Sequence, residues 1–278
     1  MFDSQHETPE LLWRPETRRQ AAGRIAQQMQ RHLSNQIRDP NAVFEDRDDG
    51  ESPWSDGGEV VVGGVYIRLF LTNPAWRLRS PRTFLTDLLN ETVTALPKDS
   101  SEGSRGEVCA RALALLLRSR PTLSESLSSR GELPRLATLL AAHPAAIAPV
   151  VAAAAASQVC ATAMASTDMM LGIKRCVKSS RAAGGAACEA LASIMNNVAN
   201  NSASDALLAQ ALECDLIGEL LTLLETGVDG QAAAHLVNAL KVMSRNNTHG
   251  ERVKAALARS AVWEQYAAQR HDLFITTT

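Results

Sequence analysis

One apolar spacing recurs along this chain at intervals of roughly 40 to 47 residues, a period typical of helical repeat proteins. In such proteins a unit buries its apolar face only by stacking on its neighbours. The spacing therefore predicts an all-α fold, an armadillo/HEAT-like right-handed helical solenoid. Its copies are Leu133-Leu136-Leu139-Leu140, Met170-Ile173-Cys176-Val177, Ile217-Leu220-Leu223-Leu224 and, more faintly, Trp263 and Tyr266.

Composition supports helices and excludes a strong global charge. Of the 278 residues 45% are hydrophobic but only 4% aromatic, which favours closely packed Ala- and Leu-rich helices over a β-sandwich. The formal net charge of −2 gives no field that would draw the chain to nucleic acid. We therefore expect no nucleic-acid partner.

The five cysteines show no CxxC spacing and fall within apolar helical patterns, which predicts buried free thiols in the cytoplasm. The stretch 137–167 carries no charged residue, but Pro144, Pro149 and many alanines favour packed solenoid helices over a transmembrane span. The first residues show no signal-peptide pattern.

The chain divides by pattern into a disordered N-terminus (1–12), an N-terminal helical extension (13–97), armadillo-like repeats (98–270) and a C-terminal tail (271–278). Within the extension, a polar helix is expected at 16–37. Residues 39–58 form an acidic segment too poor in apolar residues to order itself, so we expect a flexible loop, with an acidic recognition segment as the alternative. The repeats are placed at 104–142, 144–178, 184–226 and 230–270, with three helices each.

The run from Val60 to Leu71 has two interpretations. Its β-branched residues suggest a pair of strands around Gly63 and Gly64, whereas Val62, Tyr66, Leu69 and Phe70 would make one face of a helix. Because Asn73 and Pro74 end the run as a helix terminator would, we predict a helix.

Several helix starts carry recognisable capping chemistry. Ser80 before Pro81 predicts a helix that ends before Pro97. Capping boxes, in which a Ser or Thr precedes a Glu by three residues, mark three more starts, at Ser104 with Glu107, Thr122 with Glu125, and Thr248 with Glu251.

No motif for catalysis or cofactor binding emerges. The glycines lack phosphate-loop spacing, and there is no serine elbow, histidine pair at metal spacing or clear carboxylate pair. We predict a chain without enzymatic activity, cofactor or metal.

Two polar clusters have both a structural and a functional interpretation. Lys174, Arg175, Lys178 and Arg181 form either an ordinary solvated face or a contact for a partner or lipid headgroup. The cluster Asn196, Asn197, Asn200 and Asn201 fits a helix end and turn, although amides at such a site can also clamp an extended peptide.

Several strings of the sequence closely resemble the C-terminal part of the receptor-mediated-endocytosis-eight proteins. They are Glu59 to Phe70, Asn73-Pro74, Leu78-Arg79, Pro81-Arg82 with Phe84-Leu85, Ala187 to Leu191, Ser260 to Trp263 and His271 to Ile275. The resemblance runs in unbroken order from about Trp13 to Ile275. It is more specific than any repeat period.

That resemblance implies a part of a very large endosomal DnaJ-type co-chaperone, cytoplasmic and peripheral to the early endosome membrane. It implies roles in endosomal sorting, receptor recycling and receptor-mediated endocytosis. The implied partners are Hsc70, sorting nexin with retromer, and the WASH complex. The J-domain tripeptide His-Pro-Asp is not present, since Ala145 follows His143 and Pro144, so we expect a fragment or truncated gene product that cannot stimulate Hsp70 by that route.

We predict a non-catalytic protein-interaction scaffold. The alternative is an armadillo-type Hsp70 nucleotide-exchange factor or another armadillo adaptor. Aromatic side chains and cations dominate protein interfaces, so the candidate partner-binding residues are of these kinds. They are Tyr66, Arg68, Arg79, Arg82, Lys174, Arg175, Lys178, Trp263, His271 and Phe274.

Overall fold

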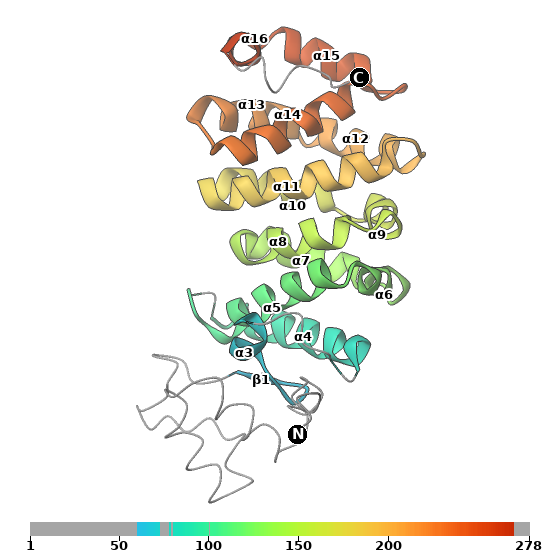
Figure 1. Cartoon of the computed structure of the whole chain (residues 1–278). Coiled ribbons are helices and arrows are strands. Elements are labelled where there is room, and N and C mark those ends of the chain that lie inside the picture. Colours follow the sequence, from blue (N-terminus) through green and yellow to red (C-terminus); the bar gives the residue numbers. More distant parts are fainter. Residues whose placement is uncertain (1–59, 73–77, 79, 100, 270–278) are drawn as a thin grey trace, which may run out of the picture. The chain divides into compact units, whose positions relative to one another are not determined.

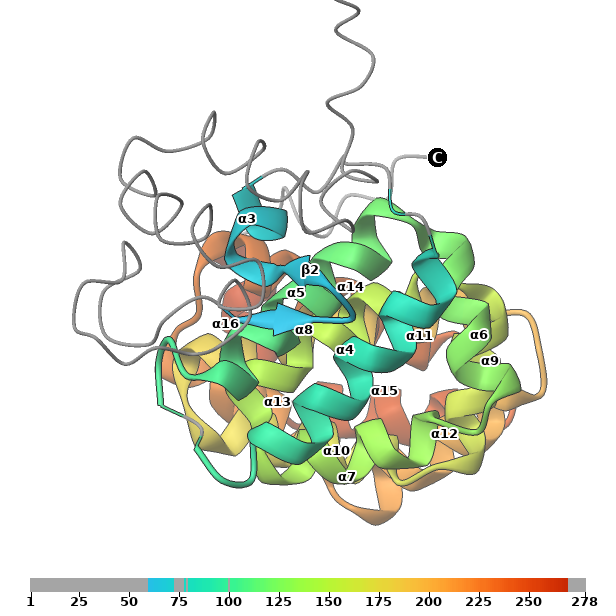
Figure 2. The same cartoon turned by 90° about the horizontal axis from the view of Figure 1, so that it is seen from below.

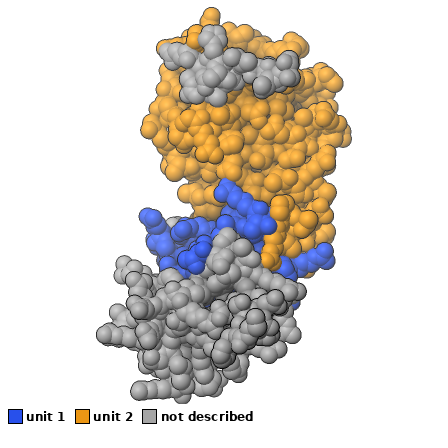
Figure 3. All heavy atoms as spheres, viewed as in Figure 1, with its two compact units in different colours: residues 1–119 blue, residues 120–278 orange. Residues whose placement is uncertain are grey.

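The computed structural model describes residues 60–72, 78, 80–99 and 101–269 (Figure 1). The chain divides into two compact units, unit 1 at residues 1–119 and unit 2 at residues 120–278 (Figure 3). The expected helix at 16–37, the acidic segment 39–58 and the two terminal segments lie outside the described residues. The boundaries of the predicted extension and repeats therefore stay a prediction.

Unit 1 begins with a β-hairpin, so the helix predicted for the whole run from Val60 to Leu71 is wrong in its first half. Strand β1 (Val61–Val62) pairs antiparallel with β2 (Val65–Tyr66), and only then does the chain enter helix α3 (Ile67–Thr72) (Figure 2). The turn residues Gly63 and Gly64 have φ values of 52° and 80°. Both angles lie in the left-handed region that a two-residue hairpin turn requires and that glycine adopts without strain.

The rest of unit 1 packs two longer helices against each other and against the hairpin and α3. Helix α4 (Pro81–Ala95) begins after Ser80 as predicted, and α5 (Arg105–Ser119) packs along it. The two backbones approach closely at Gly106, where a Cβ atom would lie 2.5 Å from the backbone nitrogen of Leu96. The Phe70 and Phe84 rings meet edge to face with centroids 5.5 Å apart, which ties α3 to α4.

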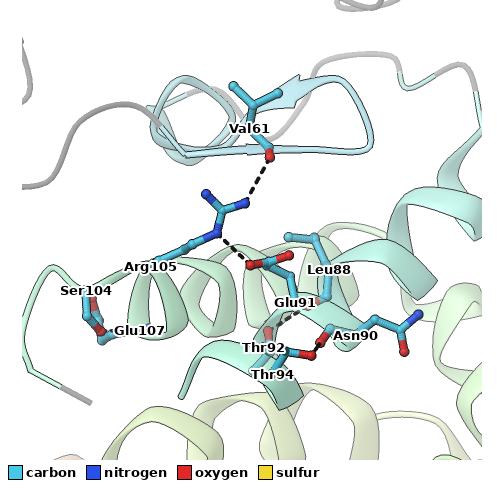
Figure 4. A network of polar contacts seen from close by, with 9 residues as sticks. All are labelled: Val61, Leu88, Asn90, Glu91, Thr92, Thr94, Ser104, Arg105 and Glu107. Atoms are coloured by element: carbon cyan, nitrogen blue, oxygen red, sulfur yellow. Dashed lines mark hydrogen bonds and ion pairs between the residues drawn. The ribbon is translucent and has the colours of Figure 1, made fainter. Parts of the chain in front are cut away.

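Polar bonds fix the start of α5 (Figure 4). The hydroxyl of Ser104 accepts a bond from the backbone nitrogen of Glu107 at 3.3 Å, which confirms this predicted N-cap. The guanidinium of Arg105 pairs with Glu91 of α4 at 2.6 Å and donates to the carbonyl of Val61 in β1 at 3.5 Å. Arg105 thus joins both helices of unit 1 to the hairpin.

Unit 2 is built from helices throughout its described residues. Two are single turns of 3₁₀ helix, η5 (Pro121–Leu123) and η6 (Met164–Ser166). The α-helices are α6 (Ser124–Ser129), α7 (Leu133–Ala142), α8 (Pro144–Ala155), α9 (Gln158–Ala163), α10 (Met169–Ser179), α11 (Arg181–Val198), α12 (Ala203–Glu213), α13 (Leu216–Thr226), α14 (Gly230–Ser244), α15 (Gly250–Ala258) and α16 (Ala261–Gln269).

These helices stack in layers, which confirms the predicted all-α solenoid class (Figure 1). The first helices of successive layers, α8, α11 and α14, pack side by side, and so do the third helices α7, α10, α13 and α16. Each layer covers the apolar face of the one before it, as the repeat spacing requires. The recurring leucine-like positions from Leu133 to Leu224 are buried, whereas Trp263 and Tyr266 in the fainter copy are half-buried.

The Ala-rich, charge-free stretch forms a buried helix in the middle of unit 2. Residues Ile147 to Ala155 of α8 are buried apart from the half-exposed Pro149, and α8 lies against α7 and α11. Among the described residues, no single helix is both long and apolar enough to span a membrane. One pair, Pro144–Ala155 with Gln158–Ser166, reaches that length only across a bend of 117°.

Two of the predicted capping boxes are wrong. Thr122 lies inside the 3₁₀ turn η5, and α6 begins at Ser124 without a side-chain cap. Thr248 precedes α15 by two residues, but its hydroxyl donates to Asp205 at 3.0 Å instead of accepting from the helix. The turn before α15 is held instead by Asn246, whose side-chain oxygen accepts from the backbone nitrogens of Thr248 at 3.0 Å and His249 at 2.8 Å.

Candidate interaction surfaces

The predicted contact residues of unit 1 differ in their exposure to solvent. Tyr66 is 0% exposed, so its ring belongs to the core and is not available to a partner. Arg68 is half-buried, and its guanidinium donates to the carbonyl of Gly103 at 3.2 Å. Arg82 is exposed on α4. Of the predicted cations in this unit, Arg82 is therefore the accessible one among the described residues.

Three predicted contact residues, Arg79, His271 and Phe274, lie outside the described residues. Trp263 is described, on α16, where its side chain is half-buried. Its backbone nitrogen donates to the hydroxyl of Ser260 at 3.2 Å, which fixes the helix start. Trp263 therefore presents part of its ring at the end of the stack.

The basic cluster on α10 is partly neutralised by the next layer. Lys178 pairs with Glu219 of α13 at 3.0 Å, and Lys174 lies 3.6 Å from the same carboxylate. The hydrogen bond from Lys178 holds the pKa of Glu219 below its ordinary value. Lys174 also donates to the carbonyl of Cys214 at 2.5 Å. These contacts join α10 to the α12–α13 turn, while Arg175 projects into solvent.

A hollow of about 380 Å³ lies beside this cluster, between the ends of α10 and α13. Lys178, Glu219 and Arg181 are the charged residues that line it. The guanidinium of Arg181 donates to the carbonyl of Thr226 at 3.0 Å, at the end of α13. The charged groups that line the hollow are thus engaged with one another or with the backbone.

Of the asparagines in the last turn of α11 and just after it, two make hydrogen bonds within the fold and two are exposed. Asn197 donates to the carbonyl of Ala155 in the preceding layer at 2.9 Å, and Asn201 donates to the hydroxyl of Thr162 at 3.2 Å. The side-chain oxygen of Asn201 also accepts from the backbone nitrogen of Ala203 at 2.9 Å. For these two residues the turn interpretation holds. Asn196 and Asn200 are exposed.

The same arrangement recurs one layer later at Asn246, which the sequence analysis did not single out. Its side-chain nitrogen donates back to Ser204 at 3.1 Å and to Asp205 at 2.7 Å. Its oxygen accepts from the backbone nitrogens of Thr248 at 3.0 Å and His249 at 2.8 Å. The sequence did carry a signal for this residue, because Asn201 and Asn246 are one repeat period apart and each follows the first helix of its layer. We call Asn201 and Asn246 the bridging asparagines.

The bridging asparagines form part of a groove of about 700 Å³ between the α11–α12 and α14–α15 turns. We call it the asparagine groove. Hydrogen bonds to Asp205, from Asn246 first and Thr248 second, hold the pKa of its carboxyl group below the ordinary value. The groove is lined by Ala199, Asn200, Asn201, Ser202, Asp205, Val242, Arg245, Asn246, Asn247 and Thr248.

The cysteines are free, and four of the five are buried. Burial raises the pKa of Cys109, Cys176 and Cys188 to about 12 and that of Cys160 to about 11, so these thiols are protonated and inert near neutral pH. Within the described residues, no group of three or more His, Cys, Asp or Glu side chains could hold a metal ion.

Comparisons with known proteins give one informative match. No family model matches the chain, and no solved structure matches it. Over an alignment of 337 residues the chain is 27% identical to the DnaJ homolog subfamily C GRV2 of Arabidopsis thaliana. The alignment covers 97% of this chain and 13% of that protein, so the chain spans a small part of its relative's length.

Proposed function

We propose that the chain is a member of the receptor-mediated-endocytosis-eight family of DnaJ-type co-chaperones and that it acts as a non-catalytic protein-interaction scaffold. Its place of action in this proposal is the cytoplasmic side of early endosomes, in endosomal sorting, receptor recycling and receptor-mediated endocytosis. The observation that carries the proposal is the match along 97% of the chain, which extends through both compact units.

The architecture supports a binding role. Stacked helices bury their apolar faces against one another and leave long outer surfaces, which helical repeat proteins use for partners. In unit 2 the hollow beside the basic cluster and the asparagine groove both lie between successive layers. Both are lined by charged and hydrogen-bonding side chains together with a few apolar ones, a mixture that suits the recognition of a partner.

The residues that resemble a J domain have a structural role here. His143 ends α7 and Pro144 opens α8, and Ala145 stands where a J domain has aspartate. A proline at the first position of a helix, preceded by a residue outside the helical conformation, is typical of a tight connection between two helices. In our proposal, stimulation of an Hsc70-type ATPase belongs to another part of the longer family proteins.

The partners in this proposal are endosomal sorting proteins, namely sorting nexin with retromer and the WASH complex. The test is affinity capture with the tagged full chain from an endosome-enriched extract, quantified by mass spectrometry against a heat-unfolded sample of the same chain. We expect sorting components to be enriched on the folded chain. Equal recovery on both samples would contradict the scaffold role.

The alternative, an Hsp70 nucleotide-exchange factor, rests on the helical repeat architecture alone. It makes a separate prediction, because such a factor binds the ATPase lobe and speeds nucleotide release. Release of a fluorescent nucleotide from Hsp70 would be measured with and without the chain. A scaffold leaves the release rate unchanged, whereas an acceleration that grows with chain concentration favours the alternative.

A further inference from the structure

The hollow beside the basic cluster carries an excess of positive charge. Its cationic lining residues are Lys178 and Arg181, and its carboxylate is Glu219. Glu219 is shared by two lysines, Lys178 at 3.0 Å and Lys174 at 3.6 Å, so its single negative charge does not neutralise both. The charge of Arg181 comes in addition. Even with the carboxylate counted in full, the walls of the hollow therefore attract an anion.

The guanidinium of Arg181 is bound to a neutral group. It donates to the carbonyl of Thr226 at 3.0 Å and forms no ion pair with a residue that the structure describes. The acids that follow on α13 and before α14, Glu225 and Asp229, do not line the hollow. Because a guanidinium has five N–H donors, Arg181 keeps several of them for a ligand.

Lys178 is able to change its partner. Its side chain is 57% exposed, and an ion pair as exposed as the one with Glu219 contributes little to stability. Lys174 is only 23% exposed and is anchored on the carbonyl of Cys214. When Lys178 turns toward a ligand in the hollow, Glu219 therefore keeps Lys174 as its counter-ion.

The other lining groups suit a ligand with several oxygens on a carbon stem. The hydroxyl of Ser180 accepts from the backbone nitrogen of Ala183 at 3.2 Å and has its own proton available to donate. Val177 and Leu223, 8% and 7% exposed, add apolar surface. A phosphate monoester carries close to two negative charges and three acceptor oxygens, whereas a carboxylate has one charge and two oxygens. The phosphate group therefore uses more of these donors.

The charge count favours a phosphorylated side chain over a membrane surface. Binding to anionic lipid is typical of clusters of about four to eight Lys and Arg residues that gain their energy together. The basic cluster has four cations, of which Lys174 and Lys178 share the carboxylate of Glu219. A hollow of about 380 Å³ has room for one phosphorylated side chain between its walls.

We propose that the hollow beside the basic cluster binds a phosphorylated serine or threonine side chain of a partner protein. Arg181 and Lys178 bind the phosphate oxygens, the hydroxyl of Ser180 donates to the same group, and Lys178 leaves Glu219 as the ligand enters. The inference rests on the proposed scaffold function, for which it names a surface and the chemistry of the partner.

The test begins with a library of peptides that have a fixed central phosphoserine and random flanking residues. Peptides captured on the immobilised full chain would be identified by mass spectrometry. The enriched peptides would then be synthesised with a fluorophore, with and without the phosphate, and measured by fluorescence anisotropy. We expect the unphosphorylated forms to bind at least about tenfold more weakly, in line with the loss of charge-assisted bonds.

Two variants should weaken binding and one should strengthen it. Arg181→Ala should cost about tenfold in affinity, and Lys178→Ala about fivefold, because the wild type gives up the Glu219 ion pair on binding. Glu219→Gln removes the competitor for Lys178 and should tighten binding about two- to fivefold. Damage to the fold cannot produce such a gain, so this variant separates binding from stability.

The matched control is Lys254→Ala on α15. Lys254 is 55% exposed and pairs with Glu251 at 2.6 Å, so it resembles Lys178 in exposure and in having a carboxylate partner. It does not line the hollow, and its loss should leave the affinity for the phosphopeptides unchanged. An equal loss of affinity in Lys254→Ala and Lys178→Ala would show a nonspecific charge effect and overturn the site.

Three other results would also overturn the site. They are enrichment of no phosphopeptide, binding that does not depend on the phosphate, and weaker binding in Glu219→Gln. A membrane is tested by sedimentation with vesicles of phosphatidylcholine that contain a phosphatidylinositol monophosphate. If the chain sediments with these vesicles through Lys178 and Arg181 but binds no phosphopeptide, the cations serve a membrane and the proposal is wrong.

The hollow and the scaffold function can fail separately. If Lys178→Ala and Arg181→Ala still capture endosomal sorting proteins but no longer bind phosphopeptides, the scaffold function acts through another surface. If the wild-type chain binds phosphopeptides in the hollow but captures no endosomal sorting protein, the phosphate site stands and the proposed function falls.

Discussion

The substitution Asn246→Ala should loosen the connection between the layer of α11 to α13 and the layer of α14 to α16. It removes bonds to Ser204, which is 3% exposed, and to the backbone nitrogens of Thr248 and His249. At about 1 kcal/mol of net stabilisation for each hydrogen bond, these three bonds contribute about 3 kcal/mol. The part-buried bond from Asn246 to Asp205 is left out of this sum.

The neighbouring residue supplies the control. Asn247 is exposed and its side chain makes no hydrogen bond to the described residues, so Asn247→Ala should change the free energy of unfolding by no more than about 0.5 kcal/mol. Both variants remove the same amide, one position apart. A difference between them therefore reports the bonds and not the loss of an asparagine.

The assay needs local resolution, because layers of a repeat protein can open separately. Amide hydrogen exchange followed by mass spectrometry would be compared for peptides covering α12, α15 and, as an internal reference, α8. We expect Asn246→Ala to speed exchange in α12 and α15 but not in α8. Equal exchange in Asn246→Ala and Asn247→Ala would refute the bridging role.

Three further predictions follow from single residues. Gly63→Ala should destabilise unit 1 more than Gly103→Ala does, as measured by urea titration. Both glycines have positive φ, but only at Gly63 would a Cβ atom meet another side chain, that of Asp87 at 2.5 Å. Equal losses of stability in the two variants would contradict this. Hydrogen bonds lower the pKa of Asp205 in the folded chain, so its carboxylate should add to the free energy of unfolding at pH values above its unfolded pKa of about 4. That contribution should be lost as the pH falls from there through the folded pKa. Carboxyl carbon NMR should show that pKa rising in Asn246→Ala, and no rise would count against the network. Among the cysteines, the half-buried Cys214 should react first with a thiol reagent at pH 8, and a fast phase that survives Cys214→Ser would contradict the burial pattern.

The fold class was predictable because the spacing of apolar residues within each helix of a repeat indicates which side chains are buried. Leu133, Met170 and Ile217 head equivalent third helices, and each is buried where the spacing put it. The hairpin was missed because a helical face and a strand pair use the same apolar residues there. The turn glycines Gly63 and Gly64 carried the decisive signal, since both adopt positive φ.

The interaction surfaces were less predictable, because contacts between layers join residues about 40 positions apart. Nothing local to Asn246 indicates that it will bond Ser204, or that Glu219 will pair with Lys178. Tyr66 looked like an anchor because aromatic residues dominate interfaces, but it sits in the core of unit 1. Residue type and sequence spacing identify side chains that are able to bind a partner. Whether those side chains are exposed depends on how the helices pack.

The most direct test of a scaffold that binds through its stacked helices is crosslinking mass spectrometry in cells that express the full-length form. Lysines are spread over successive layers of unit 2, with Lys178 and Lys254 more than half exposed. The account predicts crosslinks from these lysines to endosomal sorting proteins. Crosslinks from them to the ATPase lobe of Hsp70 alone would contradict it.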